Sequence, residues 1–401
     1  MHMRIRLLSR VWLALGLLVL LTAPAAAQTA ADVMDNTKLR DVQLLMNSRD
    51  LKLLRAGYLT NIYYPGDMVW NGIRVRNVAI RNRGAGSRNP GKPGLRIDFN
   101  RYAKGQQFAG FNSVILDNQW QDPSLIREAL TMAAYRQMGQ AAPRSAFVRL
   151  FINGEYIGVY TLGEEVDQAF VQRSINESSG HLFEFHFVFP FFTQYLGPAL
   201  DPYKQLFEPK DHLTETDEMI YGPIRDLFKA VDGPDDAAWR QDVESRIDLP
   251  QFLTHVAIQN FLTENDGIMG YAGINNFYLY RLAGTNKHRI FPWDEDNAFT
   301  FVAASIVRQP ENRVVLFDRA FAQPDLRAFF LDVAEQCAHT LTETGWLSGE
   351  LERVAALITP AVLADTHKQF SNDQFFADLD FIRAFAATRT QTTLDELKTL
   401  R

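Results

Sequence analysis

The stretch NFLTENDGIMGYAGINNFYLYRLAGTNKHRIFPWDEDNAFTF, residues 260–301, decides the interpretation of the whole chain. Its beginning continues a helical pattern that predicts a helix over residues 254–266. After a short Gly-rich loop, aromatic and polar residues predict one strand at 275–282 and a second at 288–294, joined by a turn. The start of the first strand and the end of the second are therefore expected at one rim of a hairpin.

Three oxygen-bearing side chains are expected at this rim. Asn276 opens the first strand, Asp294 follows the second, and Asp266 arrives from the preceding loop. Hard divalent cations such as Mg²⁺ take oxygen ligands and keep some of their water, and phosphoryl transfer depends on such an ion and on positioned polar groups. Acidic residues near turns are also common as solvated turn residues, so the pattern alone leaves both interpretations open.

The beginning of the chain has the pattern of an export signal. Three arginines precede an apolar run at residues 11–21, which is short for a membrane span, and a small-residue cleavage pattern ends at Ala27. We expect residues 1–27 to be removed on export. The mature protein would then be periplasmic or secreted and would have no stable membrane span, although an uncleaved anchor is the alternative.

Charge and cysteine content exclude several classes of partner. The chain has 41 Lys and Arg and 47 Asp and Glu, a formal net charge of −6, and removal of the leader's three arginines makes this −9. This acidic balance gives no basic footprint for nucleic acid or for an anionic membrane. The single cysteine, Cys337, excludes an internal disulfide, so stability must come from the core.

The order of predicted elements indicates an α/β (α+β) fold in one continuous unit. We expect an N-terminal leader at 28–69, in which residues 35–54 form a short helix and a turn. A central domain with a mixed antiparallel sheet follows at 70–320, and residues 321–401 are helical in period. No internal repeat or low-complexity linker divides the chain.

Two local signals in the central domain are strong. Asn153-Gly154 lies between two alternating runs and predicts a tight β-hairpin. Upstream, Asp122 or Ser124 can cap a helix that Gly139 ends.

Some polar and Gly-rich positions are candidate ligand contacts. The loop RNRGAGSR at 81–88 could bring backbone amides close to phosphate, and Lys92 and Arg96 follow it. Such loops are also ordinary turns, and Arg96 could be an outward-facing strand residue. Glu164 follows a strand and could hold a basic side chain or begin a helix. The chain contains neither H-E-x-x-H nor G-x-S-x-G, so the sequence gives no case for a zinc protease or a serine hydrolase.

Several segments occur together in an order that a known family shares. They are IRNRGAGSRNPGKPGLRIDF at 80–99, the stretch at 116–167 that contains DPSLIREAL and NGEYIGVYTLGEE, ENDGIMGYAGINNFYLYRL at 264–282, and IFPWDEDNAF at 290–299. Over roughly residues 70–300 the chain resembles the CotH kinase family, a group of atypical secreted protein kinases. Several motifs in the right order are more specific than any one of them.

The resemblance implies an atypical protein-kinase-like fold that binds ATP with Mg²⁺ or Mn²⁺. It implies phosphorylation of Ser or Thr on a protein or cell-surface acceptor. By position in the motifs, Asp266 would orient the acceptor hydroxyl and Asn276 would assist metal or phosphate binding. Asp294 would bind the metal, with support from Asp296. The phosphate side would be formed by Arg83, Ser87, Lys92 and Arg96, and Glu164 would hold a basic side chain.

The chain departs from the family pattern at two basic positions. Leu182-Phe183-Glu184 stands where the family often has L-Y-K, and the basic cluster after the Gly-rich loop is reduced to Lys92. Arg96 or Lys210 could replace a lost lysine. Two rival functions therefore stay open. One is a catalytically inactive envelope or surface scaffold, and the other is a metal-dependent glycosyltransferase that uses the D-x-D at 294–296.

Overall fold

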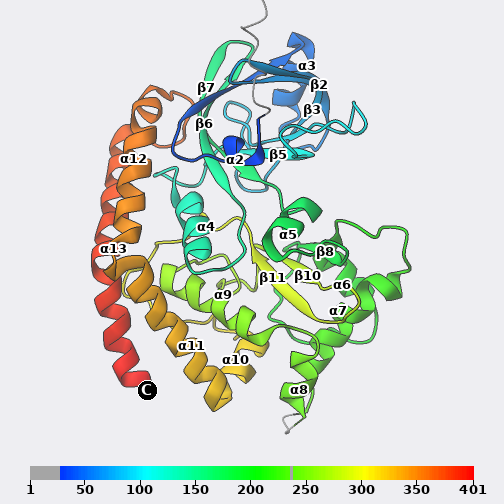
Figure 1. Ribbon diagram of the computed structural model, residues 1–401, viewed down its shortest axis with the longest axis vertical. Coiled ribbons are helices and arrows are strands. Elements are labelled where there is room, and N and C mark those ends of the chain that lie inside the picture. The colour runs from blue at the N-terminus through cyan, green and yellow to red at the C-terminus, as the bar shows by residue number, and fades with distance from the viewer. Residues whose placement is uncertain (1–27, 235–237) are drawn as a thin grey trace, which may run out of the picture.

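The computed structural model describes residues 28–234 and 238–401, and these form a barrel lobe and a larger helical lobe (Figure 1). The export signal predicted at 1–27 lies outside the described residues. Within the described ranges, no helix has the length and apolar character needed to cross a membrane. The mixed α/β class and the helical C-terminal part that the sequence predicts are confirmed.

The barrel lobe is a closed sheet of seven strands in the order β1-β2-β3-β4-β5-β7-β6. Its strands are β1 (Arg40–Met46), β2 (Tyr64–Trp70), β3 (Ile73–Asn82), β4 (Leu95–Asp98), β5 (Ser113–Asp117), β6 (Ser145–Ile152) and β7 (Glu155–Glu164). Neighbouring strands are antiparallel except for β1 and β6, which pair in parallel and close the barrel with Val42 opposite Leu150. The short helices α2 (Ala30–Val33) and α3 (Ser48–Ala56) accompany it.

The N-terminal segment differs from the prediction. The helix expected over 35–54 is instead β1 followed by α3, and β1 and β2 belong to the barrel rather than to a leader. The physical reason is an alternation of buried and exposed side chains. Val42, Leu44 and Met46 are buried, which is the two-residue period of a strand with one face in a core.

The hairpin predicted at Asn153-Gly154 is confirmed. These two residues join β6 to β7 with φ angles of 51° and 85°. Positive φ at both central residues matches the twist of the flanking strands, which is why Asn-Gly is favoured in this turn.

The helical lobe surrounds a four-stranded antiparallel sheet in the order β11-β10-β8-β9. Its strands are β8 (His181–Phe185), β9 (Phe207–Pro209), β10 (Phe277–Arg281) and β11 (His288–Pro292). Its helices are α4 (Arg127–Gln137), α5 (Gln168–Ile175), α6 (Asp201–Leu206), α7 (Asp217–Val231), α8 (Trp239–Glu244), α9 (Leu249–Leu262), α10 (Val315–Ala322), α11 (Pro324–Cys337), the π-helix η1 (Ala338–Glu343), α12 (Trp346–Ala364) and α13 (Asn372–Leu400).

The hairpin expected within 275–294 is β10 and β11, which pair with Phe277 opposite Pro292. The preceding helix, α9, ends at Leu262 rather than at residue 266. Thr263 adopts a left-handed backbone conformation with φ 57°, and this ends the helix. The residues after Thr263 are therefore loop, which leaves Asp266 free to face the hairpin.

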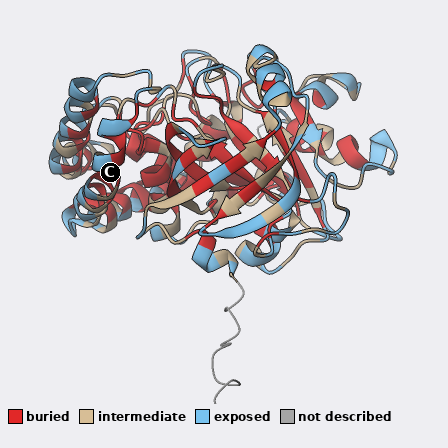
Figure 2. Cartoon of the chain, turned by 90° about the horizontal axis from the view of Figure 1, so that it is seen from above, coloured by how far each residue is buried: buried red, intermediate tan, exposed pale blue. Residues whose placement is uncertain are grey.

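Helices α12 and α13 run along one side of the molecule, from the barrel to the far end of the helical lobe (Figure 1). Buried residues fill the interior of both lobes, while the outer faces of the C-terminal helices are exposed (Figure 2). Arg389 of α13 is 1% exposed. It donates to the carbonyls of Asn260, Phe261, Val302 and Ala304 at 2.6–2.9 Å, and so fixes the end of α9 to the segment after β11.

A buried ion pair joins the barrel to α12. Lys92 Nζ lies 2.7 Å from Asp365 Oδ2, and both side chains are almost fully buried. The same oxygen accepts a hydrogen bond from Val159 N at 3.1 Å. A Cβ atom at Gly158 would lie 2.1 Å from this oxygen, and the φ of Gly158 is +133°, so only glycine fits there.

We predict that Asp365→Ala lowers the free energy of unfolding by about 3–5 kcal/mol, because it leaves the Lys92 ammonium buried without a partner. Urea unfolding monitored by circular dichroism measures this change. Asp395→Ala is the matched control, since Asp395 pairs with Lys398 on the exposed face of α13, and no measurable change is expected there. Equal effects of the two substitutions would contradict the assignment.

A second buried group makes stability depend on pH. His288 begins β11, is fully buried, and its Nδ1 donates to the Arg246 carbonyl at 2.7 Å. Its Nε2 is buried and finds no hydrogen-bond partner in residues 28–234 or 238–401. Burial, the largest cause, together with the charge of Arg281, lowers the pKa of His288 from 6.5 to about 4.

We predict that His288 weakens the fold as the pH falls from 6.5 towards about 4. In this window the unfolded chain takes up a proton that the folded chain does not, so stability falls by up to about 1.4 kcal/mol per pH unit. His288→Gln removes the titrating group, and urea unfolding across the window should then show a shallower slope. His339→Gln, at an exposed position, should keep the wild-type slope. An unchanged slope in His288→Gln would refute the prediction.

Candidate functional site

The loop after α9 carries Asp266 and is held by a buried glutamine. Gln259 Oε1 accepts a hydrogen bond from Ile268 N at 2.9 Å. A Cβ atom at Gly267 would lie 2.1 Å from Gln259 Nε2, so glycine is required for this close approach. Glu264 Oε1 accepts from Asp266 N at 2.7 Å. The backbone of Asp266 is thereby fixed from two sides.

Asn276 connects the loop to the hairpin. Its Nδ2 donates to Asp266 Oδ2 at 3.3 Å and to the Asp294 carbonyl at 3.2 Å. Asn275 Nδ2 also donates to Asp266 Oδ2, at 3.2 Å. The structure thus brings together Asp266, Asn276 and Asp294, as the hairpin geometry predicts.

Two of these residues have strained backbones. Asn276 and Asp294 lie in the left-handed region, with φ angles of 56° and 53°. This conformation is uncommon for residues other than glycine, although Asn and Asp tolerate it best. Such strain persists only where surrounding contacts enforce it, and it concentrates at functional sites.

The barrel lobe contributes a facing set of charged groups. Arg83, just after β3, forms an ion pair with Asp117 at the end of β5. The Arg83 guanidinium carbon also lies 5.8 Å from the centre of the Trp293 ring, which places it beside the β11 end of the hairpin. Glu128 of α4 lines the same pocket as Arg83 and Asp117.

Negative charge exceeds positive charge in the cleft between the hairpin rim and these barrel residues. Burial raises the pKa of Asp294 to about 6, with Asp117 and Asp266 adding to the rise and Arg83 opposing it. Burial also raises the pKa of Glu128 to about 8, and Asp117 and Asp294 add to this rise. Neighbouring carboxylates that raise each other's pKa are a sign of uncompensated negative charge.

The residues present fit a hard divalent cation. Neither carboxylate oxygen of Asp294 accepts a hydrogen bond from the described part of the chain, while Asp266 receives only amide donors. Within the described ranges, the acids here do not supply three carboxylates within reach of one ion. Mg²⁺ commonly binds one or two carboxylates together with water and phosphate oxygens, so this donor set suits Mg²⁺ or Mn²⁺ bound with a phosphate.

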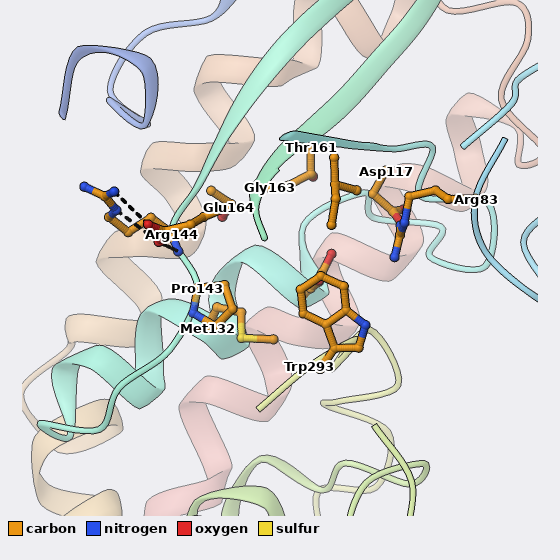
Figure 3. A pocket seen from close by; sticks show the side chains of 12 residues that line it. Arg83, Asp117, Met132, Pro143, Arg144, Thr161, Gly163, Glu164 and Trp293 are labelled. Atoms are coloured by element: carbon orange, nitrogen blue, oxygen red, sulfur yellow. Dashed lines mark hydrogen bonds and ion pairs between the residues drawn. The ribbon is translucent and has the colours of Figure 1, made fainter. Parts of the chain in front are cut away.

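A small pocket adjoins this cluster between the barrel and α4 (Figure 3), and its free volume of about 20 Å³ is enough for about one water molecule. Arg83 and Asp117 lie at one end and the Arg144–Glu164 pair at the other, with Trp293, Met132 and Pro143 along one wall. Its apolar walls are Ile115, Met132, Pro143 and Gly163. The Thr161 hydroxyl at the pocket is buried and has no hydrogen-bond partner among the described residues, so it could bond to a ligand that reaches it.

The other predicted ligand contacts are distributed around the cleft. Asp296 lies within electrostatic range of Asp294, and burial and that charge raise its pKa. Glu164 holds two basic side chains, Arg144 at 2.8 Å and Arg173 at 2.7 Å. The family resemblance predicts a single basic partner for this acid.

Three residues predicted on the phosphate side lie in different surroundings. Arg96 pairs with Glu165 at 2.7 Å. The Ser87 carbonyl accepts from Asn118 at 2.9 Å, and Ser87 has no described contact with the acidic cluster. Lys92 is buried in its pair with Asp365, so its ammonium is already engaged by a carboxylate. The structure therefore does not bring Lys92 or Ser87 into the cluster.

Lys210, considered above as a replacement for a lost lysine, lies next to the position in question. Its Nζ donates to Glu184 at 2.8 Å and to Glu208 at 2.9 Å. Glu184 lies close enough to Asp294 to raise its pKa. A basic group is thus present beside residue 184, supplied from across the sheet.

Four residues at the site are not predicted from the sequence: Asp117, Glu128, Trp293 and Thr161. Asp117 ends the buried strand β5, and an acid at the end of a buried strand is a local sequence signal for a site residue. Glu128 and Thr161 lie inside regular elements, where nothing local distinguishes them. Their position at the cleft depends on the packing of α4 against the barrel.

Comparison with known proteins identifies the family. The family described as CotH kinase protein matches residues 80–393. The chain belongs to the CotH kinase family. This confirms the resemblance carried by the motifs and extends it through most of the C-terminal helices.

One curated relative covers nearly the whole chain. Inner spore coat protein H of Bacillus subtilis (strain 168) is 24% identical over 368 residues, which is 89% of this chain and 97% of that protein. The match therefore includes the N-terminal strands of the barrel as well as the family region.

Two solved structures show weaker likeness. One is the Shewanella oneidensis MR-1 toxin–antitoxin system HipA and HipB with its operator DNA, at 12% identity and a TM-score of 0.36, covering 74% of this chain and 62% of that chain. The other is the Helicobacter pylori proinflammatory kinase CtkA, at 9% identity and a TM-score of 0.32, covering 76% and 93%. The chain thus spans less than two thirds of the first structure's chain, and no functional argument rests on TM-scores this low.

Proposed function

We propose that this CotH family member is a metal-dependent phosphotransferase that moves the γ-phosphoryl group of ATP to a Ser or Thr hydroxyl on a protein or cell-surface acceptor. The observation that carries the proposal is the convergence of Asp266, Asn276 and Asp294 at one rim, facing Arg83 across the cleft.

Asp294 and the amide oxygen of Asn276 would hold Mg²⁺ or Mn²⁺, with Asp296 in support. The ion, when bound, neutralises phosphate charge and orients the transferred group. Asp294 is poised for this role because its carboxylate faces other acids and accepts no hydrogen bond from the described protein. Arg83 supplies a fixed positive charge on the barrel side, and Asp117 and the Trp293 ring keep it in place.

Asp266 would orient the acceptor hydroxyl. In the transfer, the hydroxyl oxygen forms a bond to the γ-phosphorus, the bond from that phosphorus to the ADP oxygen breaks, and the hydroxyl proton passes to Asp266. Asn275 and Asn276 both donate to Asp266 Oδ2, which leaves Oδ1 for the acceptor. These bonds fix the carboxylate plane, so the residue acts mainly by position.

The nucleobase would enter between the barrel and α4, where this small pocket would have to open further to hold it. Its walls are apolar on the faces of Ile115, Met132 and Pro143, as flat heterocycles require. The unpartnered Thr161 hydroxyl offers a polar contact. Phosphates leading from this pocket towards Asp294 would pass Arg83, which lines the pocket end (Figure 3).

An inactive scaffold is the second candidate, and one observation favours it. Each basic residue of the phosphate side already pairs with a carboxylate: Arg83 with Asp117, Lys92 with Asp365, and Arg96 with Glu165. A scaffold would bind no nucleotide under any metal condition.

We predict that Asp294→Asn abolishes metal-dependent ATP binding and phosphoryl transfer. Asn tolerates the left-handed backbone at this position, so the substitution removes the negative charge without breaking the turn. Calorimetric titration of ATP, with and without Mg²⁺ or Mn²⁺, measures the binding, and transfer of labelled phosphate to a generic Ser/Thr protein substrate measures the activity.

Asp395→Asn on the exposed face of α13 is the matched control and should bind as the wild type does. Binding and activity that survive in Asp294→Asn would refute the site assignment. No binding by the wild type under any metal condition would favour the scaffold, and stabilisation by sugar nucleotides in place of ATP would favour the glycosyltransferase.

We further predict that Gly163→Val weakens ATP binding by about tenfold or more without unfolding the protein. A Cβ atom at Gly163 would meet only Ile115 Cβ, at 3.7 Å, so a larger side chain fits the strand and projects where Ile115 lines the pocket. Nucleotide affinity should fall because the added bulk would occupy space that the nucleobase needs, while the melting temperature should stay near the wild-type value. Unchanged affinity would remove the nucleobase from this pocket.

A further inference from the structure

Two histidines and a glutamate meet at one end of the four-stranded sheet. His181 is the first residue of β8, and His212 and Glu215 lie in the loop between β9 and α7. One ligand atom from each of the three lies within 4.8 Å of the other two. His181 Nε2 is 2.8 Å from Glu215 Oε2, and the two imidazole rings stack with centres 4.0 Å apart.

This cluster is separate from the proposed phosphoryl-transfer site. His181 pairs across the sheet with Arg281, the last residue of β10, whereas Asn276 precedes the first residue of that strand. Five strand residues at about 3.3 Å each separate the two ends by roughly 15 Å. No residue of the cluster belongs to the motifs that form the proposed phosphotransferase site.

Asp211 supports the cluster from behind. Its Oδ1 lies 2.8 Å from His212 Nδ1, which leaves His212 Nε2 as the nitrogen able to bind a cation. The same carboxylate accepts hydrogen bonds from Leu182 N at 3.2 and 3.3 Å, and so ties the loop to β8. A carboxylate on the far nitrogen of a histidine is the usual support for a metal-binding imidazole.

The backbone of the loop fits the same interpretation. His212 has a φ of 54°, a left-handed conformation that surrounding contacts must enforce. The two stacked rings are nearly parallel, at 16°, so one ring must turn about its Cβ–Cγ bond before both can direct a nitrogen at one ion.

The local charge also permits a cation. Arg281 is the positive group facing the cluster, and its guanidinium donates to the Met219 carbonyl at 2.8 Å. Asp211 and Glu215 both lie within its electrostatic range. Two carboxylates against one guanidinium leave one net negative charge around the two imidazole rings.

We propose that His181, His212 and Glu215 bind one Zn²⁺ ion through two imidazole nitrogens and a carboxylate oxygen, with a fourth position open to water. Two histidines and an acid are a ligand set typical of zinc. The ion would replace the proton on His181 Nε2, the atom that now contacts Glu215, and that proton would move to Nδ1 of the same ring, so a neutral His181 keeps its charge. It would clamp the loop before α7 onto the start of β8.

A neighbouring cluster is a poorer candidate. Glu184, His186 and Glu208 also lie close together, but the Lys210 ammonium contacts both carboxylates at 2.8 and 2.9 Å. The lysine already neutralises the charge that a metal ion would use. This cluster therefore provides an internal control for the proposal.

The test is calorimetric titration of Zn²⁺ into the metal-free full chain, together with the visible absorption of its Co²⁺ derivative. The variants are His212→Asn, which tolerates the left-handed backbone, and Glu215→Gln. The controls are His186→Ala at the neighbouring cluster and Asp294→Asn at the proposed catalytic site. Far-ultraviolet circular dichroism checks the folding of each variant.

We expect one Zn²⁺ per chain, with affinity reduced by about tenfold or more in both ligand variants and unchanged in both controls. The Co²⁺ derivative of the wild type should show the strong visible bands of a low-coordinate site, a readout that needs no variant. Absence of saturable binding, wild-type affinity in both ligand variants, or loss of binding in either control would overturn the proposal. Because Asp294→Asn keeps the zinc site, these outcomes do not depend on ATP binding.

Discussion

The register between β10 and β11 is the constraint on which the functional geometry depends. Phe277 lies opposite Pro292, so Asn276 meets Trp293, whose N–H donates to the Asn276 carbonyl at 3.2 Å. Asp294 is the next residue, within reach of the Asn276 side chain. A shift of one residue would turn the side chains of β11 to the other face of the sheet. The buried aromatic residues of β10 and the packing of Phe291 against α5 hold this register, so the core of the helical lobe fixes the site.

The remaining contacts hold the loops that meet this rim. Arg389 fastens the end of α9 to the segment after β11, and Gln259 and Asn276 fix Asp266 from opposite sides. The left-handed backbones of Asn276 and Asp294 persist because these bonds surround them. Electrostatic repulsion among the carboxylates works against folding, and a bound cation would relieve it. This trade of stability for binding is common where side chains must be preorganised.

The sequence predicted the site where local rules apply. The alternation of β10 and β11, the turn between them and the acids at their ends are short-range features, and they sufficed to group Asp266, Asn276 and Asp294. The Asn153-Gly154 hairpin could be predicted from the sequence for the same reason. Contacts between distant segments were not readable: Lys92 pairs with Asp365, 273 residues away, and no local pattern separates a lysine that binds phosphate from one that binds a buried acid.

The secondary structure of the N-terminal segment was predicted wrongly for a different reason. Residues 40–46 carry both a helical and an alternating pattern, and the barrel decides between them by offering Val42 and Leu44 an interior. Asp117 and Glu128 reach the cleft only because β5 and α4 meet across it. Tertiary packing thus adds Asp117 and Glu128 to the charged groups of the site that the sequence predicts.

The most direct test of the central claim is a crystal structure with Mn²⁺ and a non-hydrolysable ATP analogue, in which anomalous scattering locates the metal. The account predicts a manganese peak between Asp294 and the Asn276 amide oxygen, with the phosphates passing Arg83. A peak at another cluster of the chain, or an analogue bound away from Asp294, would contradict it.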